Sequence, residues 1–204
     1  MFYTAVTIDS STFKITYHDR IMTLGSCFAE NIGNKMHDAY FLSDVNPFGV
    51  LYNPVSIANS IEILLEKKQF THSDIFDTKS LWQSFSHSSL FSETTPQACL
   101  QKINTRLESA NVFLKETDFL LITFGTAWVF EDKKSGRVVS NCHKLAASEF
   151  IRRRLSVQEI VLVYTDLINK LQTQLPNLKI VFTVSPIRIG NHPELVIIDV
   201  NFVN

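Results

Sequence analysis

The sequence predicts an α/β fold in which a mostly parallel sheet lies between layers of helices. Two nearly continuous apolar runs, at 118–124 and 179–184, are typical of strands that are buried on both faces. Helical patterns alternate with these strands along the chain, which is the arrangement that gives a parallel sheet. Small or polar residues follow the strands at Gly25-Ser26, Gly125-Thr126 and Ser185-Pro186. Because ligands bind at the carboxyl ends of parallel strands, these three strand ends predict a site.

The first predicted unit is a strand followed by a helix. Residues 20–24 form a short apolar run, which Gly25-Ser26 ends. The apolar residues that follow at helical spacing are Phe28, Ile32 and Met36. A strand that leads through Gly-Ser into a helix is the first half of a βαβ unit. The next segment, 46–49, is rich in turn-forming residues and predicts a loop.

Capping signals predict two further helices, and an amphipathic pattern predicts a third. Asn53-Pro54 and Thr95-Pro96 each combine an N-cap residue with a proline at the first helical position. The second of these helices is expected to continue to about Leu114. Residues 156–174 carry an amphipathic pattern and predict the third helix.

Between the two buried strands the chain makes a polar excursion. Residues 127–130 and 137–140 flank a polar segment and predict a hairpin or a long ordered excursion. The basic residues Lys144, Arg188 and Arg152-Arg153-Arg154 could face an anionic substrate. The arginine run is more typical of a solvated helix start.

The composition is that of a globular protein with nearly equal numbers of basic and acidic residues. Of its 204 residues 45% are hydrophobic and 19% are charged, which excludes a disordered or fibrous chain. This length predicts a single domain over residues 1–204. The 19 basic and 20 acidic residues give a net charge of -1. This balance gives no reason to expect nucleic acid or a membrane as a partner.

The sequence shows neither a recognisable targeting signal nor a metal-binding motif. Its first residues lack a basic region before a long apolar run, and no apolar stretch is long enough to span a membrane, so we expect a cytoplasmic protein. Cys27, Cys99 and Cys142 are odd in number and widely spaced. We therefore expect no disulfide framework, no metal knuckle and no cofactor.

Ser26 is the strongest candidate for chemistry. The helix that starts at Cys27 or Phe28 would point its free N–H groups and its positive dipole end at whatever Ser26 attacks. Those N–H groups could also form part of an oxyanion hole. The alternative is that Ser26 only caps the helix, which is a common use of serine. The spacing differs from the G-x-S-x-G nucleophile elbow, because Ser26 directly follows Gly25.

The segment Gly25-Ser26-Cys27-Phe28-Ala29 resembles the GSCFA family, a bacterial branch of the SGNH (GDSL-like) hydrolases. The further blocks that resemble this family, in order, are Asn46-Pro47-Phe48-Gly49, Tyr52-Asn53-Pro54, the His87-Ser88-Ser89 region, Thr123-Phe124-Gly125-Thr126-Ala127-Trp128, Asn141-Cys142-His143-Lys144 and Thr183-Val184-Ser185-Pro186-Ile187-Arg188. The resemblance extends from about Ile21 to Arg188. Several blocks in order are more specific than one five-residue match.

The resemblance implies a flavodoxin-like three-layer α/β/α sandwich and a serine esterase with an acyl-enzyme on Ser26. The oxyanion would be held by the N–H of Ser26 or Cys27 and by the N–H of Gly49. Gly125-Thr126 falls on a block that usually reads G-x-N-D, so the asparagine of that hole is missing from its usual place. Asn141 is one candidate to replace it.

The C-terminal end departs from this pattern. SGNH enzymes keep their base in a late D-x-x-H block, and the relatives of this chain continue from S-P-x-R to a histidine. Here that position is Ile189, which also stands three residues before His192 in place of the aspartate. We therefore expect a truncated, frameshifted or remodelled C-terminal end that has lost its usual base.

The remaining histidines are the candidates for a substitute base. His143 and His87 lie in blocks that resemble the family, and we expect both to line the pocket, with His143 as the candidate base and His87 as a binding or structural residue. His18 and His72 have polar neighbours and predict surface positions, and His37 predicts solvent exposure or helix packing.

Cys27 offers an alternative nucleophile. A cysteine at a helix N-terminus can have a lowered pKa, and Cys142-His143 could supply a thiol and an imidazole from a neighbouring loop. Isolated cysteines are more often small buried hydrophobic residues, which is what we expect of Cys99.

The sequence therefore predicts a hydrolase of ester bonds, with a small-molecule or carbohydrate ester as its substrate. The competing prediction is a catalytically inactive domain that binds a ligand without turnover, because a serine hydroxyl is a weak nucleophile without a base within hydrogen-bond reach. A second chain could also supply the base across an interface, and the sequence leaves the oligomeric state open.

Overall fold

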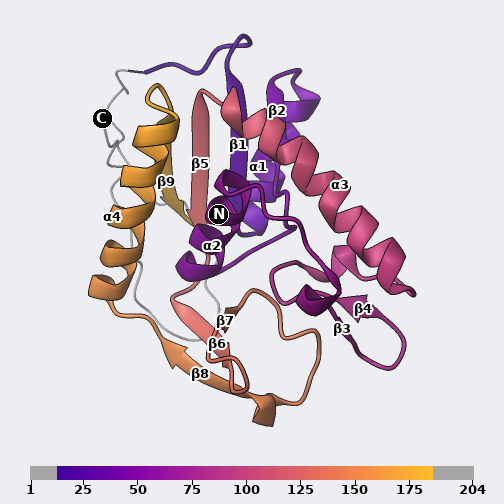
Figure 1. Cartoon of the computed structure of the whole chain (residues 1–204). Coiled ribbons are helices and arrows are strands. Elements are labelled where there is room, and N and C mark those ends of the chain that lie inside the picture. The colour runs from indigo at the N-terminus through magenta and orange to yellow at the C-terminus, as the bar shows by residue number, and fades with distance from the viewer. Residues whose placement is uncertain (1–12, 186–204) are drawn as a thin grey trace, which may run out of the picture.

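The structure, a computed structural model, describes residues 13–185, and within them four parallel strands form the central sheet (Figure 1). The strand order is β2-β1-β5-β9. The strands are β1 (Arg20–Gly25), β2 (Leu42–Val45), β5 (Phe119–Phe124) and β9 (Lys179–Val184). In the register of the sheet, Leu120 pairs with Met22 on one side and with Ile180 on the other. The predicted α/β class with a parallel sheet is confirmed.

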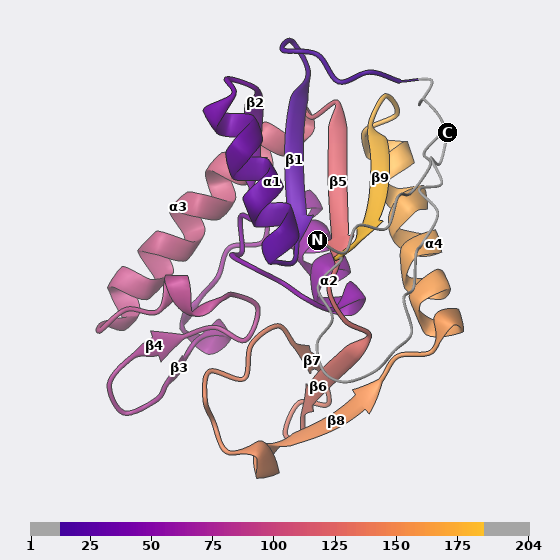
Figure 2. The same ribbon diagram turned by 180° about the vertical axis from the view of Figure 1, so that it is seen from behind.

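Helices cover both faces of this sheet. They are α1 (Cys27–Asp38), α2 (Pro54–Leu65), α3 (Pro96–Lys115) and α4 (Val157–Gln174). Figures 1 and 2, which show opposite sides, place α1 on one face and α2, α3 and α4 on the other. The main core lies between the sheet and these three helices, and its buried strand residues include Met22, Leu24, Leu120 and Ile122. Across residues 13–185, the helices are all too short or too polar to cross a membrane.

Side-chain caps explain where the helices begin. The Asn53 side chain accepts a hydrogen bond from the N–H of Ser56, and the Thr95 side chain accepts one from the N–H of Ala98. Ser156 forms a capping box with Glu159 at the start of α4. Each cap satisfies an N–H group that has no partner within its helix. The predicted helix starts at Asn53-Pro54 and Thr95-Pro96 are confirmed.

The excursion after β5 forms a separate antiparallel sheet. Its strands are β6 (Trp128–Asp132), β7 (Val138–Val139) and β8 (Phe150–Arg154), which confirms the predicted hairpin. The prediction that the arginine run starts a helix is wrong, because Arg152, Arg153 and Arg154 pair with β6 and α4 starts only at Val157. The Arg152 guanidinium lies 4.1 Å from the centre of the Trp128 ring.

Another small sheet joins β3 (Phe76–Asp77) to β4 (Trp82–Gln83). These two strands and β2 are short, and the sequence did not indicate them. In β2 the apolar residues Leu42 and Val45 flank Ser43 and Asp44, so neither a continuous apolar run nor an alternating pattern is present.

The strand order creates a switch point between β1 and β5. From β1 the chain continues to β2 at one edge of the sheet, and then crosses to β5 on the other side of β1. The connections that leave β1 and β5 therefore diverge at their carboxyl ends. Ligands of open α/β sheets bind in the crevice that such a divergence leaves. The residues directly after β1 and β5 are thus the ones to examine for a site.

The two strands approach each other closely at Gly25. We predict that Gly25→Ala lowers the free energy of unfolding by more than about 3 kcal/mol, because the new Cβ atom would lie 2.1 Å from the carbonyl oxygen of Thr123 and φ is +137°. Gly136→Ala is the matched control, since its φ is +68° but no atom lies within 4 Å of the new Cβ. It should cost only about 1 kcal/mol. Urea denaturation of both variants tests this, and equal losses would contradict it.

Candidate active site

Ser26 lies at the switch point, between the end of β1 and the start of α1. Its N–H donates to the carbonyl oxygen of Thr123 on β5 at 3.1 Å. Its Oγ accepts a hydrogen bond from the N–H of Phe28 at 3.3 Å, so Ser26 caps α1, and the residue is only 1% exposed. A Cβ atom on Gly125 would lie 3.2 Å from the Cβ of Ser26. The ends of β1 and β5 therefore meet at the serine hydroxyl.

The loop after β2 wraps around the end of β1. The Oδ1 of Asn46 accepts a hydrogen bond from the N–H of Gly25 at 2.9 Å, and the N–H of Leu51 donates to the carbonyl of Gly25 at 2.9 Å. Within this loop Gly49 has a φ of +74°, and its N–H donates to the carbonyl of Asn46 at 2.7 Å. A Cβ atom on Gly49 would lie 1.9 Å from the Oγ of Ser88. The loop is thus fixed to β1 on one side and to the His87-Ser88 segment on the other.

Tyr52 joins this loop to the end of β5. Its carbonyl oxygen accepts hydrogen bonds from the N–H groups of Gly125, at 2.8 Å, and of Thr126, at 3.0 Å. Burial raises the pKa of the Tyr52 hydroxyl, and the nearby Cys27 and Glu30 raise it further. The sequence contained Tyr52 and Asn46 in its family-like blocks, but gave no role to either.

Two buried histidines lie beyond this loop. The His87 side chain stacks on Phe48 with ring centres 4.8 Å apart, and its Nδ1 lies 3.1 Å from the Oγ of Ser84. The Nε2 of His143 lies 2.8 Å from the carbonyl oxygen of Ser84. Because a carbonyl oxygen only accepts, this Nε2 carries the proton and Nδ1 carries the lone pair. His87 Nε2 and His143 Nδ1 are buried and have no hydrogen-bond partner in the described structure.

Burial keeps both imidazoles neutral. It lowers the pKa of His87 to about 3, and the nearby His143 and Lys68 lower it further. Burial also lowers the pKa of His143, while hydrogen bonds with the main chain of Ser84 and His87 oppose that effect. At neutral pH each ring therefore has one basic nitrogen.

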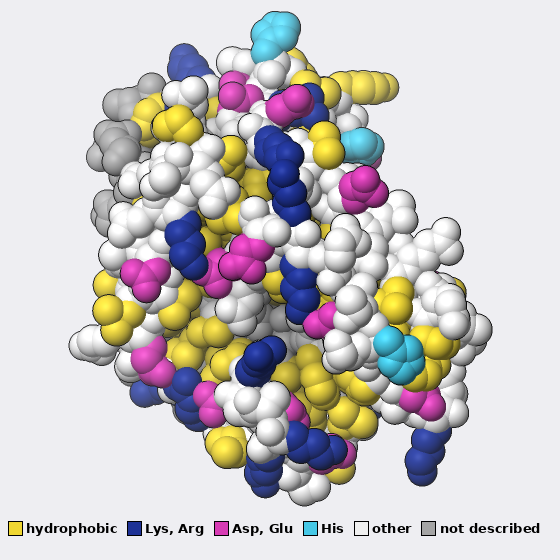
Figure 3. All heavy atoms as spheres, viewed as in Figure 1, with side chains coloured by type: hydrophobic (Ala, Val, Ile, Leu, Met, Phe, Trp, Pro, Cys, Tyr) yellow, Lys and Arg dark blue, Asp and Glu magenta, His cyan; other side chains and the backbone are white. Residues whose placement is uncertain are grey.

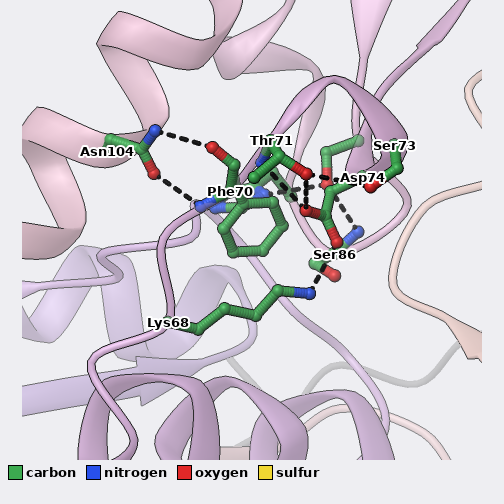
Figure 4. Close-up of polar contacts among 9 residues, drawn as sticks. Lys68, Phe70, Thr71, Ser73, Asp74, Ser86 and Asn104 are labelled. Carbon is green, nitrogen blue, oxygen red and sulfur yellow. Dashed lines mark hydrogen bonds and ion pairs between the residues drawn. The ribbon is translucent and has the colours of Figure 1, made fainter.

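The loop around Phe70 packs against His87, and Figure 4 shows the polar contacts that fix this loop. The side chain of Asn104 holds the main chain of Phe70 in both directions, accepting from its N–H at 2.8 Å and donating to its carbonyl at 2.9 Å. Lys68 forms an ion pair with Asp74 at 2.7 Å, and its ammonium group lies 4.6 Å from the centre of the Phe70 ring. Phe70 in turn places its edge against His87, with ring centres 4.9 Å apart.

The other predicted site residues are not brought to Ser26 by any described hydrogen bond. Asn141 is engaged within its own loop, where Oδ1 accepts from the N–H of His143 at 2.8 Å and Nδ2 donates to Ser89 at 3.3 Å. Over residues 13–185, no hydrogen bond connects the Oγ of Ser26 to a histidine. Arg188, Ile189 and His192, from which we predicted a binding residue and an altered C-terminal end, lie outside the described residues.

The remaining histidines lie at the surface, and the three cysteines differ in position: Cys27 follows Ser26, Cys142 precedes His143, and Cys99 is buried. His18, His37 and His72 are exposed, and Cys99 is part of the core. All three cysteines are free, and burial raises the pKa of the Cys142 thiol, which opposes its ionisation. No group of three or more metal-ligating side chains occurs in the part of the chain that the structure describes.

A cavity of about 230 Å³ lies between α2 and α3 and contains none of the predicted site residues. Its lining includes Ile63, Lys67, Leu107, Asn111 and Val112. On the face that carries α2, α3 and α4, basic and acidic side chains are intermixed with apolar ones (Figure 3).

The burial of His87 predicts how the free energy of unfolding depends on pH. Between pH 3 and pH 6.5 the unfolded chain binds a proton at this histidine that the folded chain does not, so the free energy of unfolding falls as the pH falls, by up to about 1.4 kcal/mol per unit. We expect His87→Phe to reduce this slope between pH 6.5 and 5 in chemical denaturation. His72→Gln, at an exposed histidine, should leave it unchanged. An unaltered slope in His87→Phe would show that the ring is protonated in the folded chain.

Comparison with known proteins identifies the family. A model of the GSCFA family matches residues 20–201, a range that contains all the strands and helices described above and extends beyond Arg188. Neither a curated protein nor a solved structure matches the chain. Since the family model covers most of the sequence, including Ser26, the two buried histidines and both loops that surround them, the chain belongs to the GSCFA family.

Proposed function

We propose that the chain is a serine esterase with Ser26 as its nucleophile. The position of Ser26 supports this proposal more than any other observation, since it combines the switch point of a parallel sheet with the N-terminus of α1. A helix N-terminus stabilises the negative charge that develops during attack on an ester. We further propose that the chain shares the mechanism of the SGNH (GDSL-like) hydrolases and that its substrate is an acylated carbohydrate or another small ester.

The reaction requires a base. In the proposed first step, the Oγ of Ser26 bonds to the ester carbonyl carbon while its proton passes to the base, and the carbonyl electron pair moves to the oxygen. The C–O bond to the alcohol then breaks, and the alcohol leaves with that proton. Water repeats the sequence on the acyl-enzyme and releases the carboxylic acid and Ser26.

We propose His143 as this base. Its hydrogen bond to the carbonyl of Ser84 fixes the tautomer and leaves the lone pair on Nδ1, which no described residue occupies. A backbone carbonyl that orients an imidazole in this way is a common support of a general base. His87 has the lower basicity of the two and is enclosed by aromatic rings, so we assign it a structural role.

One observation favours the alternative of a binding domain without turnover. The Oγ of Ser26 accepts from the N–H of Phe28, as in an ordinary helix cap, and donates to no base in residues 13–185. A serine without a base is weakly nucleophilic. The two functions differ in whether Ser26 reacts.

Covalent labelling distinguishes them. We expect a fluorophosphonate to modify Ser26, as located by peptide mapping, and Ser26→Ala to abolish both the adduct and the hydrolysis of a short-chain ester. Ser109→Ala, which removes a hydroxyl from the exposed side of α3, should react like the unmodified chain. A folded chain that neither reacts with the fluorophosphonate nor hydrolyses smaller esters would favour the alternative, a binding domain without turnover. An adduct on Cys27 would rule out the serine mechanism.

A second variant tests the base. His143→Gln can keep a donor to the carbonyl of Ser84 but removes the basic nitrogen. We expect the rate of Ser26 labelling to fall by about 100-fold or more, since general-base catalysis typically contributes that much. The melting temperature should be recorded alongside, and a folded His143→Gln chain that labels at the original rate would exclude His143.

A further inference from the structure

Asn46 holds the end of β1 from the side of β2. Its main-chain N–H donates to the carbonyl of Thr23 at 2.9 Å, and its Oδ1 accepts from the N–H of Gly25 at 2.9 Å. Because an N–H group only donates, the atom that faces Gly25 must be the oxygen, and the orientation of the side-chain amide is fixed. Gly25 directly precedes Ser26, so this amide lies beside the segment that carries the proposed nucleophile.

The nitrogen of the same amide has no partner. Asn46 is only 6% exposed, and its Nδ2 is buried without any hydrogen-bond acceptor. A buried donor without a partner destabilises the folded chain, because it has lost its hydrogen bonds to water, so its presence calls for a physical reason. The main chain of Asn46 has a φ of +42°, in the left-handed region, where asparagine is enriched among the residues other than glycine. The fold therefore maintains an unused buried donor at this position.

Most other donors near Ser26 are already used. The engaged main-chain N–H groups are those of Ser26 (to Thr123), Gly49 (to Asn46), Gly125 and Thr126 (both to Tyr52). The N–H of Cys27, at the first position of α1, has no carbonyl partner in the described part of the chain. The N–H of Cys27 and the side-chain Nδ2 of Asn46 are thus two donors beside the Gly25-Ser26 segment that no described residue uses.

We propose that Asn46 is a catalytic residue that donates a hydrogen bond from Nδ2 to the carbonyl oxygen of the ester, together with the N–H of Cys27. This inference rests on the proposed esterase function. As the Oγ of Ser26 bonds to the carbonyl carbon, the negative charge collects on that oxygen, and the two donors stabilise it without transferring a proton. When the alcohol leaves, the C=O bond forms again and the donors are released.

The test is Asn46→Asp, which preserves the acceptor for the N–H of Gly25 but replaces the NH₂ group with an oxygen. We expect the rate of Ser26 labelling by a fluorophosphonate to fall by about 100-fold or more, the usual cost of removing one oxyanion donor. For a short-chain ester, kcat should fall with little change in KM, whereas a purely structural defect would also change the melting temperature. Asn169→Asp, the same substitution at an exposed position of α4, is the matched control.

The possible outcomes distinguish the role of Asn46 from that of Ser26. A folded Asn46→Asp chain that labels at the original rate would overturn the role of Asn46 and leave that of Ser26 intact. Failure of the folded unmodified chain to label would overturn the proposed esterase, and this role with it. If Asn46→Asp does not fold, NMR of the unmodified chain with ¹⁵N-labelled asparagine decides, because the Asn46 side-chain protons must shift downfield when Ser26 carries the phosphonyl group. An unchanged Asn46 signal would overturn the proposal.

Discussion

At the end of β1, the main chain of Gly25 lies so close to β5 that a Cβ atom there would be 2.1 Å from the carbonyl oxygen of Thr123. The same carbonyl accepts the N–H of Ser26, so the close approach and the position of the serine have one cause. On the opposite side, Asn46 holds Gly25 through its side chain. The strand end is therefore fixed from both neighbours, and α1 begins from a rigid point with Ser26 as its cap. A site built on strands keeps its geometry better than one built on loops alone.

Three loops extend the site outward from these strands, each bonded to the next. The loop that contains Phe48 bonds to Ser88, whose N–H donates to the carbonyl of Phe48 at 2.9 Å. The segment around Ser88 bonds in turn to the loop before His143, where the N–H of Ser140 donates to the carbonyl of Phe85 at 2.8 Å. Ser26 thus depends on the sheet, while the histidines depend on contacts between loops. Loop contacts open more easily than a parallel sheet, so the distance between Ser26 and the histidines is the adjustable part of this arrangement.

The low polarity around the histidines determines which chemistry they can support. Burial disfavours the charged imidazolium, so His143 and His87 are held in their basic form at neutral pH but bind a proton weakly. A general base works best when its pKa is near the working pH. His143, which keeps hydrogen bonds that oppose the effect of burial, is closer to this condition than His87.

The sequence by itself determined the elements whose signals are local. Apolar runs located β5 and β9, N-cap residues located the starts of α2 and α3, an amphipathic pattern located α4, and the Gly25-Ser26 pair located the junction of β1 and α1. These signals depend on neighbours within a few residues, so they can be read along the chain. Only the tertiary structure decided the remaining features, because they depend on partners far away in the sequence. The strand β2 forms by pairing with β1, and Arg152 belongs to a strand because that strand pairs with β6. The His143 side chain forms a hydrogen bond with a carbonyl group 59 residues earlier. The unpartnered Nδ2 of Asn46 likewise depends on the tertiary positions of all the neighbouring donors and acceptors.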